Sequence, residues 1–68
     1  MKIVLNGAAR EVTESTTISS LLEEVGINPD RVAVEVNLQI IDRHDLKSTF
    51  FKEGDQVEVI GFVGGGIL

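Results

Sequence analysis

The sequence contains no cysteine, so neither a disulfide bond nor a thiolate zinc site can stabilise the fold. No apolar run approaches the roughly 20 residues that a membrane-spanning helix needs. The first apolar run ends at Asn6 and is too short for a secretory signal. There is also no pairing of a nucleophile with a base of the kind that enzymes need. These absences predict a cytoplasmic protein that is not an enzyme and does not enter a membrane.

Basic residues are scarce in this chain. Six lysines and arginines face eleven aspartates and glutamates among 68 residues, which gives a formal net charge of -5. This balance argues against binding to nucleic acid or to an anionic membrane and fits a basic protein partner better. The hydrophobic fraction of 43% is typical of one small folded domain.

Histidine occurs once, at His44, between Asp42 and Asp45. One imidazole with two carboxylates could suggest a metal or acid–base cluster. In a polar loop these three residues make a poor metal site, and a solvated loop is the favoured interpretation. We therefore expect no metal site.

The first part of the chain predicts a hairpin. Residues 3–5 are β-prone, and Asn6-Gly7 is the strongest short signal for a type I′ turn, which needs positive φ at both positions. Residues 8–12 should return as an antiparallel strand, and their polar character suits a sheet edge.

A short helix is predicted next. Thr17 is a good N-cap whose hydroxyl can accept from the backbone N–H of Ser20. One apolar face follows at helical spacing, formed by Ile18, Leu21, Leu22 and Val25. Gly26 is placed to end the helix in the left-handed conformation. Because a helix of about two turns is not stable alone in water, it should lie on a sheet.

The second half predicts three more strands, at residues 31–37, 39–41 and 56–60, with a turn at 53–55. Residues 49–51 should return apolar side chains to the core. The helix and the first hairpin leave the last strand free to pair in parallel with the first. The expected fold is α+β: a β-grasp, ubiquitin-like mixed sheet with one helix packed across one face.

The last strand has a predicted outer face. If Val57 and Val59 face the helix, Ile60 and Phe62 lie on the open side of the sheet. Exposed apolar residues often mark contact sites, so Ile60 and Phe62 are candidate partner contacts. The alternative is that Phe62 folds back onto its own domain.

Three consecutive glycines, Gly64, Gly65 and Gly66, follow this strand. Glycine loses the most backbone entropy on folding, so this run should leave the domain as a flexible tail. The expected organisation is a β-grasp domain over residues 1–63 and a tail over residues 64–68. A tail without side chains can enter a narrow tunnel and present a carbonyl there. The alternative is a chain end without a role.

Five short segments occur in order along the chain: Ile3-Val4-Leu5-Asn6-Gly7, Thr17-Ile18-Ser19-Ser20-Leu21-Leu22, Val32-Ala33-Val34-Glu35-Val36-Asn37, Glu53-Gly54-Asp55 with Val57-Glu58-Val59-Ile60, and Phe62-Val63-Gly64-Gly65-Gly66. Through these segments the whole chain resembles the ThiS family of sulfur carriers in thiamine biosynthesis. Each is weak alone, but their order and the chain length make them fairly specific together.

The resemblance implies a mechanism at Gly66. An E1-like adenylating enzyme, which uses ATP and magnesium, would activate the glycine carboxylate. A persulfide from a cysteine desulfurase or another sulfur donor would displace AMP and leave a thiocarboxylate. Thiazole synthase would accept the sulfur. The carrier itself would be a protein substrate without a catalytic site or bound cofactor.

The sequence departs from the family at its end, because Ile67 and Leu68 follow Gly66. Our hypothesis is that a processing protease removes both residues. The alternatives are that the two residues are foreign to the natural chain, or that this homologue does not carry sulfur.

Two other functions remain open. The chain could carry sulfur to a different acceptor, such as molybdopterin, cysteine or another metabolite. It could instead be a non-covalent β-grasp binding module that works through its open sheet face and has an inert tail.

Overall fold

A computed structural model describes residues 1–61 of the chain, and residues 62–68 lie outside the described part. The strands are β1 (Lys2–Leu5), β2 (Ala8–Glu11), β3 (Val32–Val36), β4 (Gln39–Ile40) and β5 (Gln56–Gly61). The helices are α1 (Ile18–Glu24) and two single 3-10 turns, η1 (Pro29–Arg31) and η2 (Arg43–Asp45). The predicted boundary after residue 63 falls outside the described residues, so it stays a prediction.

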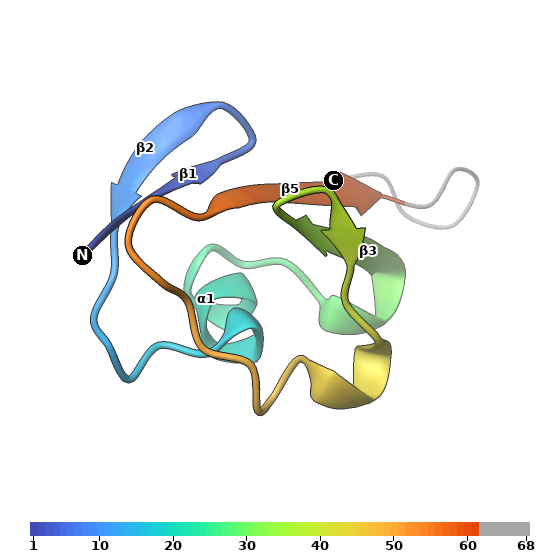
Figure 1. The fold of residues 1–68 in the computed structure, drawn as a ribbon. Coiled ribbons are helices and arrows are strands. Elements are labelled where there is room, and N and C mark those ends of the chain that lie inside the picture. Colours follow the sequence, from blue (N-terminus) through green and yellow to red (C-terminus); the bar gives the residue numbers. More distant parts are fainter. Residues whose placement is uncertain (62–68) are drawn as a thin grey trace.

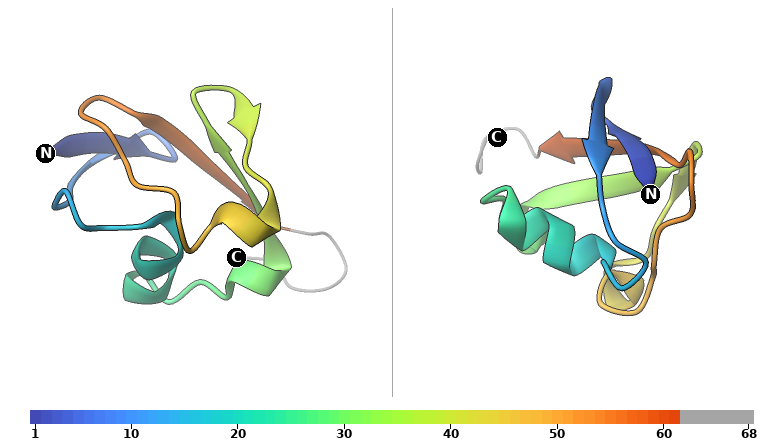
Figure 2. Two further views of the ribbon diagram at one scale, coloured as in Figure 1. Left: turned by 60° about the horizontal axis from the view of Figure 1, so that its bottom comes forward. Right: turned by 90° about the vertical axis from the view of Figure 1, so that its left-hand side faces the viewer.

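The five strands form one mixed sheet in the order β2-β1-β5-β3-β4. β1 pairs in parallel with β5, and the remaining neighbours are antiparallel. The helix α1 lies across one face of this sheet (Figure 1). The two 3-10 turns lie on the same side as α1 (Figure 2). The predicted α+β fold, a β-grasp sheet with one helix across it, is confirmed.

The turn between β1 and β2 has the predicted geometry. Asn6 and Gly7 have φ angles of +47° and +84°, and Leu5 pairs with Ala8. The Asn6 side chain also accepts a hydrogen bond from the N–H of Val59 at 2.8 Å. This turn therefore closes the hairpin and joins it to the central strand β5.

The start of α1 is closed by a reciprocal pair of hydrogen bonds between Thr17 and Ser20. The Thr17 hydroxyl accepts from the Ser20 N–H at 3.1 Å, and the Ser20 hydroxyl oxygen accepts from the Thr17 N–H at 2.9 Å. Two backbone N–H groups at the helix start, those of Thr17 and Ser20, are thus satisfied, as in a capping box. Gly26, with φ +81°, takes the left-handed conformation just after the helix, as predicted.

The core lies between α1 and the sheet. It contains eleven buried apolar side chains: Ile3, Val12, Ile18, Leu21, Leu22, Val32, Val34, Leu46, Phe51, Val57 and Val59. The expectation for residues 49–51 is only half right, because Phe51 is buried but Phe50 is 53% exposed. Adjacent residues in extended backbone point in opposite directions, so only one of the two phenylalanines can reach the core.

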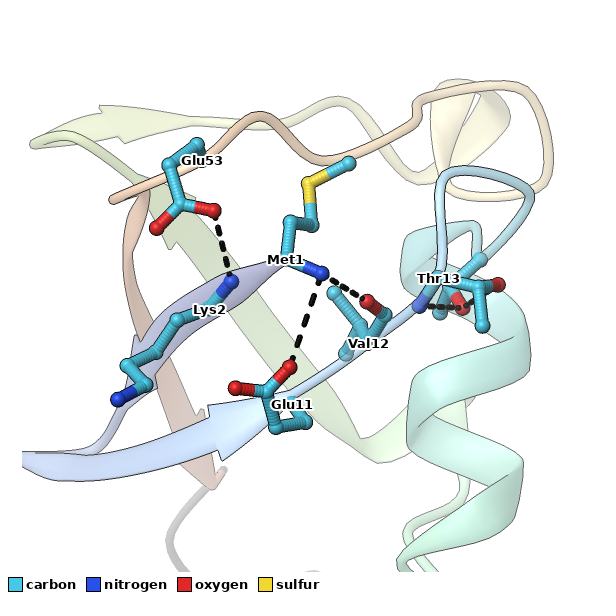
Figure 3. Close-up of polar contacts among 7 residues, drawn as sticks. Met1, Lys2, Glu11, Val12, Thr13 and Glu53 are labelled. Atoms are coloured by element: carbon cyan, nitrogen blue, oxygen red, sulfur yellow. Dashed lines mark hydrogen bonds and ion pairs between the residues drawn. The ribbon is translucent and has the colours of Figure 1, made fainter.

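Polar contacts fasten β1 to the turn before β5 (Figure 3). The Glu53 carboxylate accepts from the Lys2 N–H at 3.0 Å, and the Gly54 N–H donates to the Lys2 carbonyl at 2.7 Å. The Met1 ammonium donates to the Val12 carbonyl at 2.7 Å. These contacts hold the first strand at both of its neighbours, β2 and β5.

A buried carboxylate organises the start of β5. Asp55 is only 7% exposed. It accepts from the Lys52 N–H at 2.8 Å and from the Asn37 side-chain amide at 3.0 Å. Asn37 in turn accepts from the Gln56 N–H at 3.0 Å. The β3–β4 turn is thereby fixed against the entry to β5.

Candidate partner-binding surface

The strand β5 has one covered and one open face, as its alternation predicts. Val57 and Val59 are 1% and 5% exposed beneath α1, whereas Ile60 is 47% exposed. The open position of Ile60 is confirmed, and its contact with a partner stays a prediction. Phe62 and the three predicted tail residues, Gly64, Gly65 and Gly66, lie outside the described residues.

The open face combines apolar and acidic side chains. Ile60 on β5 lies opposite Ala33 on β3, and Glu58 lies opposite Glu35. Glu35 in turn lies opposite Ile40 on β4, which is 72% exposed. Directly opposed residues have Cβ atoms about 5 Å apart, so the two carboxylates repel each other across the strands. The strands β3, β4 and β5 contain no lysine or arginine to offset this repulsion.

A second hairpin turn lies at the edge of this face, and the sequence analysis did not identify it. Asn37 and Leu38 connect β3 to β4, with φ angles of +53° and +70°. A bulky residue at positive φ is an outlier that costs on the order of 1–3 kcal/mol. Leu38 is also 89% exposed, the highest value among the large apolar side chains in residues 1–61. The chain thus holds a strained leucine in solvent.

Leu38 borders a hollow in the open face. The hollow has a volume of about 400 Å³ and is lined by Asn37, Leu38, Gln56 and Glu58. In Figure 2 (left) the turn between β3 and β4 projects from the side of the molecule away from α1. Exposed apolar side chains beside a concave surface often mark sites of contact with a protein partner.

The signal for this turn was weak in the sequence. Two β-prone runs separated by Asn-X are a hairpin pattern when X is glycine, and here X is leucine. The Asn37 amide explains why the turn still forms, because it bonds to Asp55 and to the Gln56 N–H. These long-range contacts compensate for the unfavourable second residue.

The residues around His44 form a short capped turn. Residues 1–61 hold no group of three or more histidine, aspartate or glutamate side chains that could bind a metal ion. The Asp42 carboxylate accepts from the His44 N–H at 3.0 Å and contacts Nδ1 of the same residue at 3.1 Å. The backbone N–H of His44, and then its side chain, lower the pKa of Asp42. Asp42 acts as the N-cap of η2.

Comparison with known protein families matches residues 3–66 to the model described as the ThiS family. The chain belongs to the ThiS family. Its β-grasp fold agrees with the crystal structure of a thiamine biosynthesis protein (ThiS) from Geobacter metallireducens. That structure has a TM-score of 0.81 and 33% sequence identity, and the match covers 97% of this chain and 100% of the other. ThiS is a small sulfur carrier protein of thiamine biosynthesis and not an enzyme.

Two curated relatives differ in length. A sulfur carrier protein ThiS from Escherichia coli is 27% identical over 66 residues, which are 97% of this chain and 100% of the relative. A thiazole synthase from Paramagnetospirillum magneticum is 39% identical over 66 residues. The match covers 97% of this chain but only 20% of that longer protein. The chain therefore spans about a fifth of the length of this relative.

No helix within residues 1–61 is both long enough and apolar enough to cross a membrane.

Proposed function

We propose that this protein carries sulfur as a thiocarboxylate at Gly66 and delivers it to thiazole synthase for the thiazole of thiamine. The observation that carries this proposal is the family match over residues 3–66, whose last position is Gly66. A second support is the thiazole synthase from Paramagnetospirillum magneticum, in which a region 39% identical to this chain makes up 20% of the protein. Joining two domains in one chain raises their effective concentration, which benefits domains that act on each other.

The chemistry begins with a poor electrophile. A carboxylate would have to expel oxide, so an E1-like enzyme first joins the Gly66 carboxylate to the α-phosphate of ATP and pyrophosphate leaves, with magnesium balancing the phosphate charge. A persulfide from a cysteine desulfurase then attacks the acyl carbon and expels AMP. A thiol cleaves the resulting S–S bond, which leaves the thiocarboxylate on Gly66 and a disulfide on the donor.

Two features of this chain suit that role. The sequence has no cysteine, so no internal thiol competes for the activated acyl group. The strand β5 ends at Gly61, and the five residues from 62 to 66 span at most about 17 Å when fully extended. A partner that reacts with Gly66 must therefore approach within that distance of the end of β5, next to Ile60.

The proposed chemistry requires a free carboxylate on Gly66. In this sequence the Gly66 carbonyl is joined to Ile67. A protease that hydrolyses this peptide bond would release the residues that follow and expose the reactive glycine. Intact mass of sulfur-bearing protein from the native cell tests this step, and a sulfur-bearing form that retains Leu68 would contradict it.

The transfer itself can be tested with purified components. The chain ending at Gly66 is incubated with the adenylating enzyme, ATP, magnesium and sulfide, and its mass is recorded. We expect a mass increase equal to the exchange of one oxygen for one sulfur at the C-terminus. The matched control is the 68-residue chain, which should gain no sulfur. Absence of the exchange in the Gly66 form would refute the proposal.

A binding module with an inert tail is the second candidate, and the exposed Leu38, Ile40 and Ile60 favour it. Deleting residues 65–68 separates the two functions. A carrier should remain folded and lose sulfur transfer, whereas a binding module should keep its affinity and its activity. Transfer to an acceptor other than thiazole synthase would appear as a sulfur-loaded chain that thiazole synthase does not discharge.

A further inference from the structure

The leucine at position 38 does not serve the stability of the folded chain. Its side chain is 89% exposed, so it adds little to the core. The equivalent position in the first hairpin is Gly7, which tolerates positive φ without strain. A glycine at position 38 would fit the same geometry better. The leucine therefore opposes folding through its backbone strain, and a side chain this exposed gains little from burial in return.

From this contrast we propose that Leu38 is an anchor that inserts into an apolar pocket on thiazole synthase. Ile40 and Ile60 would extend the contact, and a basic side chain of thiazole synthase would lie against Glu35 and Glu58. We call the surface formed by Glu35, Leu38, Ile40, Glu58 and Ile60 the open-face footprint. The inference rests on the proposed function, in which thiazole synthase receives the sulfur.

Charge determines the chemistry of the occupant. Glu35 and Glu58 face each other on neighbouring strands, and β3, β4 and β5 carry no cation. Opposed carboxylates are unfavourable in the free protein and become favourable around an arginine or lysine from a partner. A second copy of this chain would add two more carboxylates to the footprint. The net charge of -5 likewise disfavours self-association through this face.

The position of the open-face footprint relative to the end of β5 indicates which protein covers it. Leu38 lies five residues beyond Ala33, and Ala33 pairs with Ile60, so the footprint runs roughly 15 Å along the sheet. It begins at the end of β5, from which the reactive glycine must reach the acceptor. An enzyme that admits Gly66 into its active site therefore covers Ile60 first and extends toward Leu38. Such a patch is compatible with a specific interface of about 800 Å² per partner.

The test measures binding and stability together. The 68-residue chain and thiazole synthase of the same organism are titrated by calorimetry, and thermal unfolding is recorded for every variant. For Leu38→Gly we expect affinity about ten-fold or more weaker. Its melting temperature should stay the same or rise by a few degrees, because the strain is relieved. Leu38→Met should keep the wild-type affinity within about three-fold, since it preserves the apolar side chain.

A second, matched pair of variants tests the contribution of charge in the open-face footprint. Glu58→Lys and Glu14→Lys change the net charge equally, but Glu14 lies in the exposed loop before α1. We expect Glu58→Lys to weaken binding about ten-fold and Glu14→Lys to change it by less than about two-fold. Added salt should weaken wild-type binding more than binding of Glu58→Lys.

Three outcomes would overturn the inference. The first is unchanged affinity of Leu38→Gly, or no binding of the wild-type chain to thiazole synthase. The second is a loss of affinity that appears only together with a lower melting temperature. The third is that Leu38→Gly, in the chain ending at Gly66, loses sulfur loading by the adenylating enzyme instead, which would assign the footprint to that enzyme. Failure of the wild-type chain ending at Gly66 to take up sulfur would refute the proposed function. The calorimetric comparison of Leu38→Gly with the wild type would still decide whether Leu38 binds thiazole synthase.

Discussion

The two faces of the sheet use similar residue types under different constraints. Beneath α1, valine, isoleucine and leucine side chains are almost fully buried and α1 is capped at both ends. On the open face, Ile40 and Ile60 remain 72% and 47% exposed beside two opposed glutamates. The covered face therefore provides stability, and the open face carries features that weaken the isolated chain. Such features are expected where a surface serves a partner.

The largest expected difference between the faces comes from matched truncations. Leu22→Ala beneath α1 should lower the free energy of unfolding by about 2–5 kcal/mol, because Leu22 is 1% exposed and its removal leaves a cavity. Ile60→Ala should lower it by no more than about 1 kcal/mol. Urea unfolding of both variants measures the difference. Equal losses would mean that the open face contributes to the core.

The same contrast holds for carboxylates that bind backbone N–H groups. Asp55 is buried, and Asp55→Ala leaves the Lys52 N–H and the Asn37 amide without their acceptor. We expect a loss of about 1–3 kcal/mol. Glu53→Ala removes a similar bond, from the Lys2 N–H, at an exposed site where water can replace it.

Chemical denaturation of the Asp55 and Glu53 variants gives the comparison directly. A loss for Glu53→Ala as large as that for Asp55→Ala would show that burial does not set the cost. Asp55→Asn is a useful third variant because it keeps the shape. It should still be destabilising, since one of its two acceptor atoms becomes a donor that faces another donor.

The covered face could be predicted well from sequence because its signals are local and periodic. The apolar spacing of Ile18, Leu21 and Leu22 indicated α1, Thr17 its start and Gly26 its end. The alternation of Val57 and Val59 placed Ile60 on the open side. Strand pairing then followed from the order of the elements, since the helix brings β5 back beside β1.

The open face could be predicted only in part because its features depend on contacts between distant residues. The opposition of Glu35 and Glu58 arises from the β3–β5 register, which no local pattern gives. The turn at Leu38 is held by Asp55, eighteen residues from Asn37 in the chain. Gly66, the predicted reaction site, rests on the family match rather than on described geometry.

A smaller loss of stability is expected from removing the N-cap of α1. The cap supports the helix that covers the sheet, but it is not part of the apolar core. Thr17→Ala removes the acceptor of the Ser20 N–H and should lower the free energy of unfolding by about 1 kcal/mol. Ser15→Ala removes only an exposed hydroxyl that contacts Thr13 and serves as the control. If the two variants unfold at the same urea concentration, the cap does not stabilise α1.

The smallest effect is expected at Asp42, an exposed N-cap of the single turn η2. The His44 N–H and side chain lower the pKa of Asp42 below its ordinary value of about 3.9. Its folded pKa is thus lower than its unfolded pKa, so the carboxylate stabilises the fold above about pH 4. That stabilisation is lost as the pH falls through the folded pKa. Asp42→Ala should therefore melt slightly below the wild type at pH 7 and approach it in acid.

Carboxyl carbon shifts followed by NMR between pH 2 and pH 6 measure the Asp42 pKa directly. An Asp42 midpoint at or above the ordinary value would contradict the capping contact. Asp42 and Asp55 both accept backbone N–H bonds, but only Asp55 is shielded from water, so removal of Asp42 should have much the smaller effect.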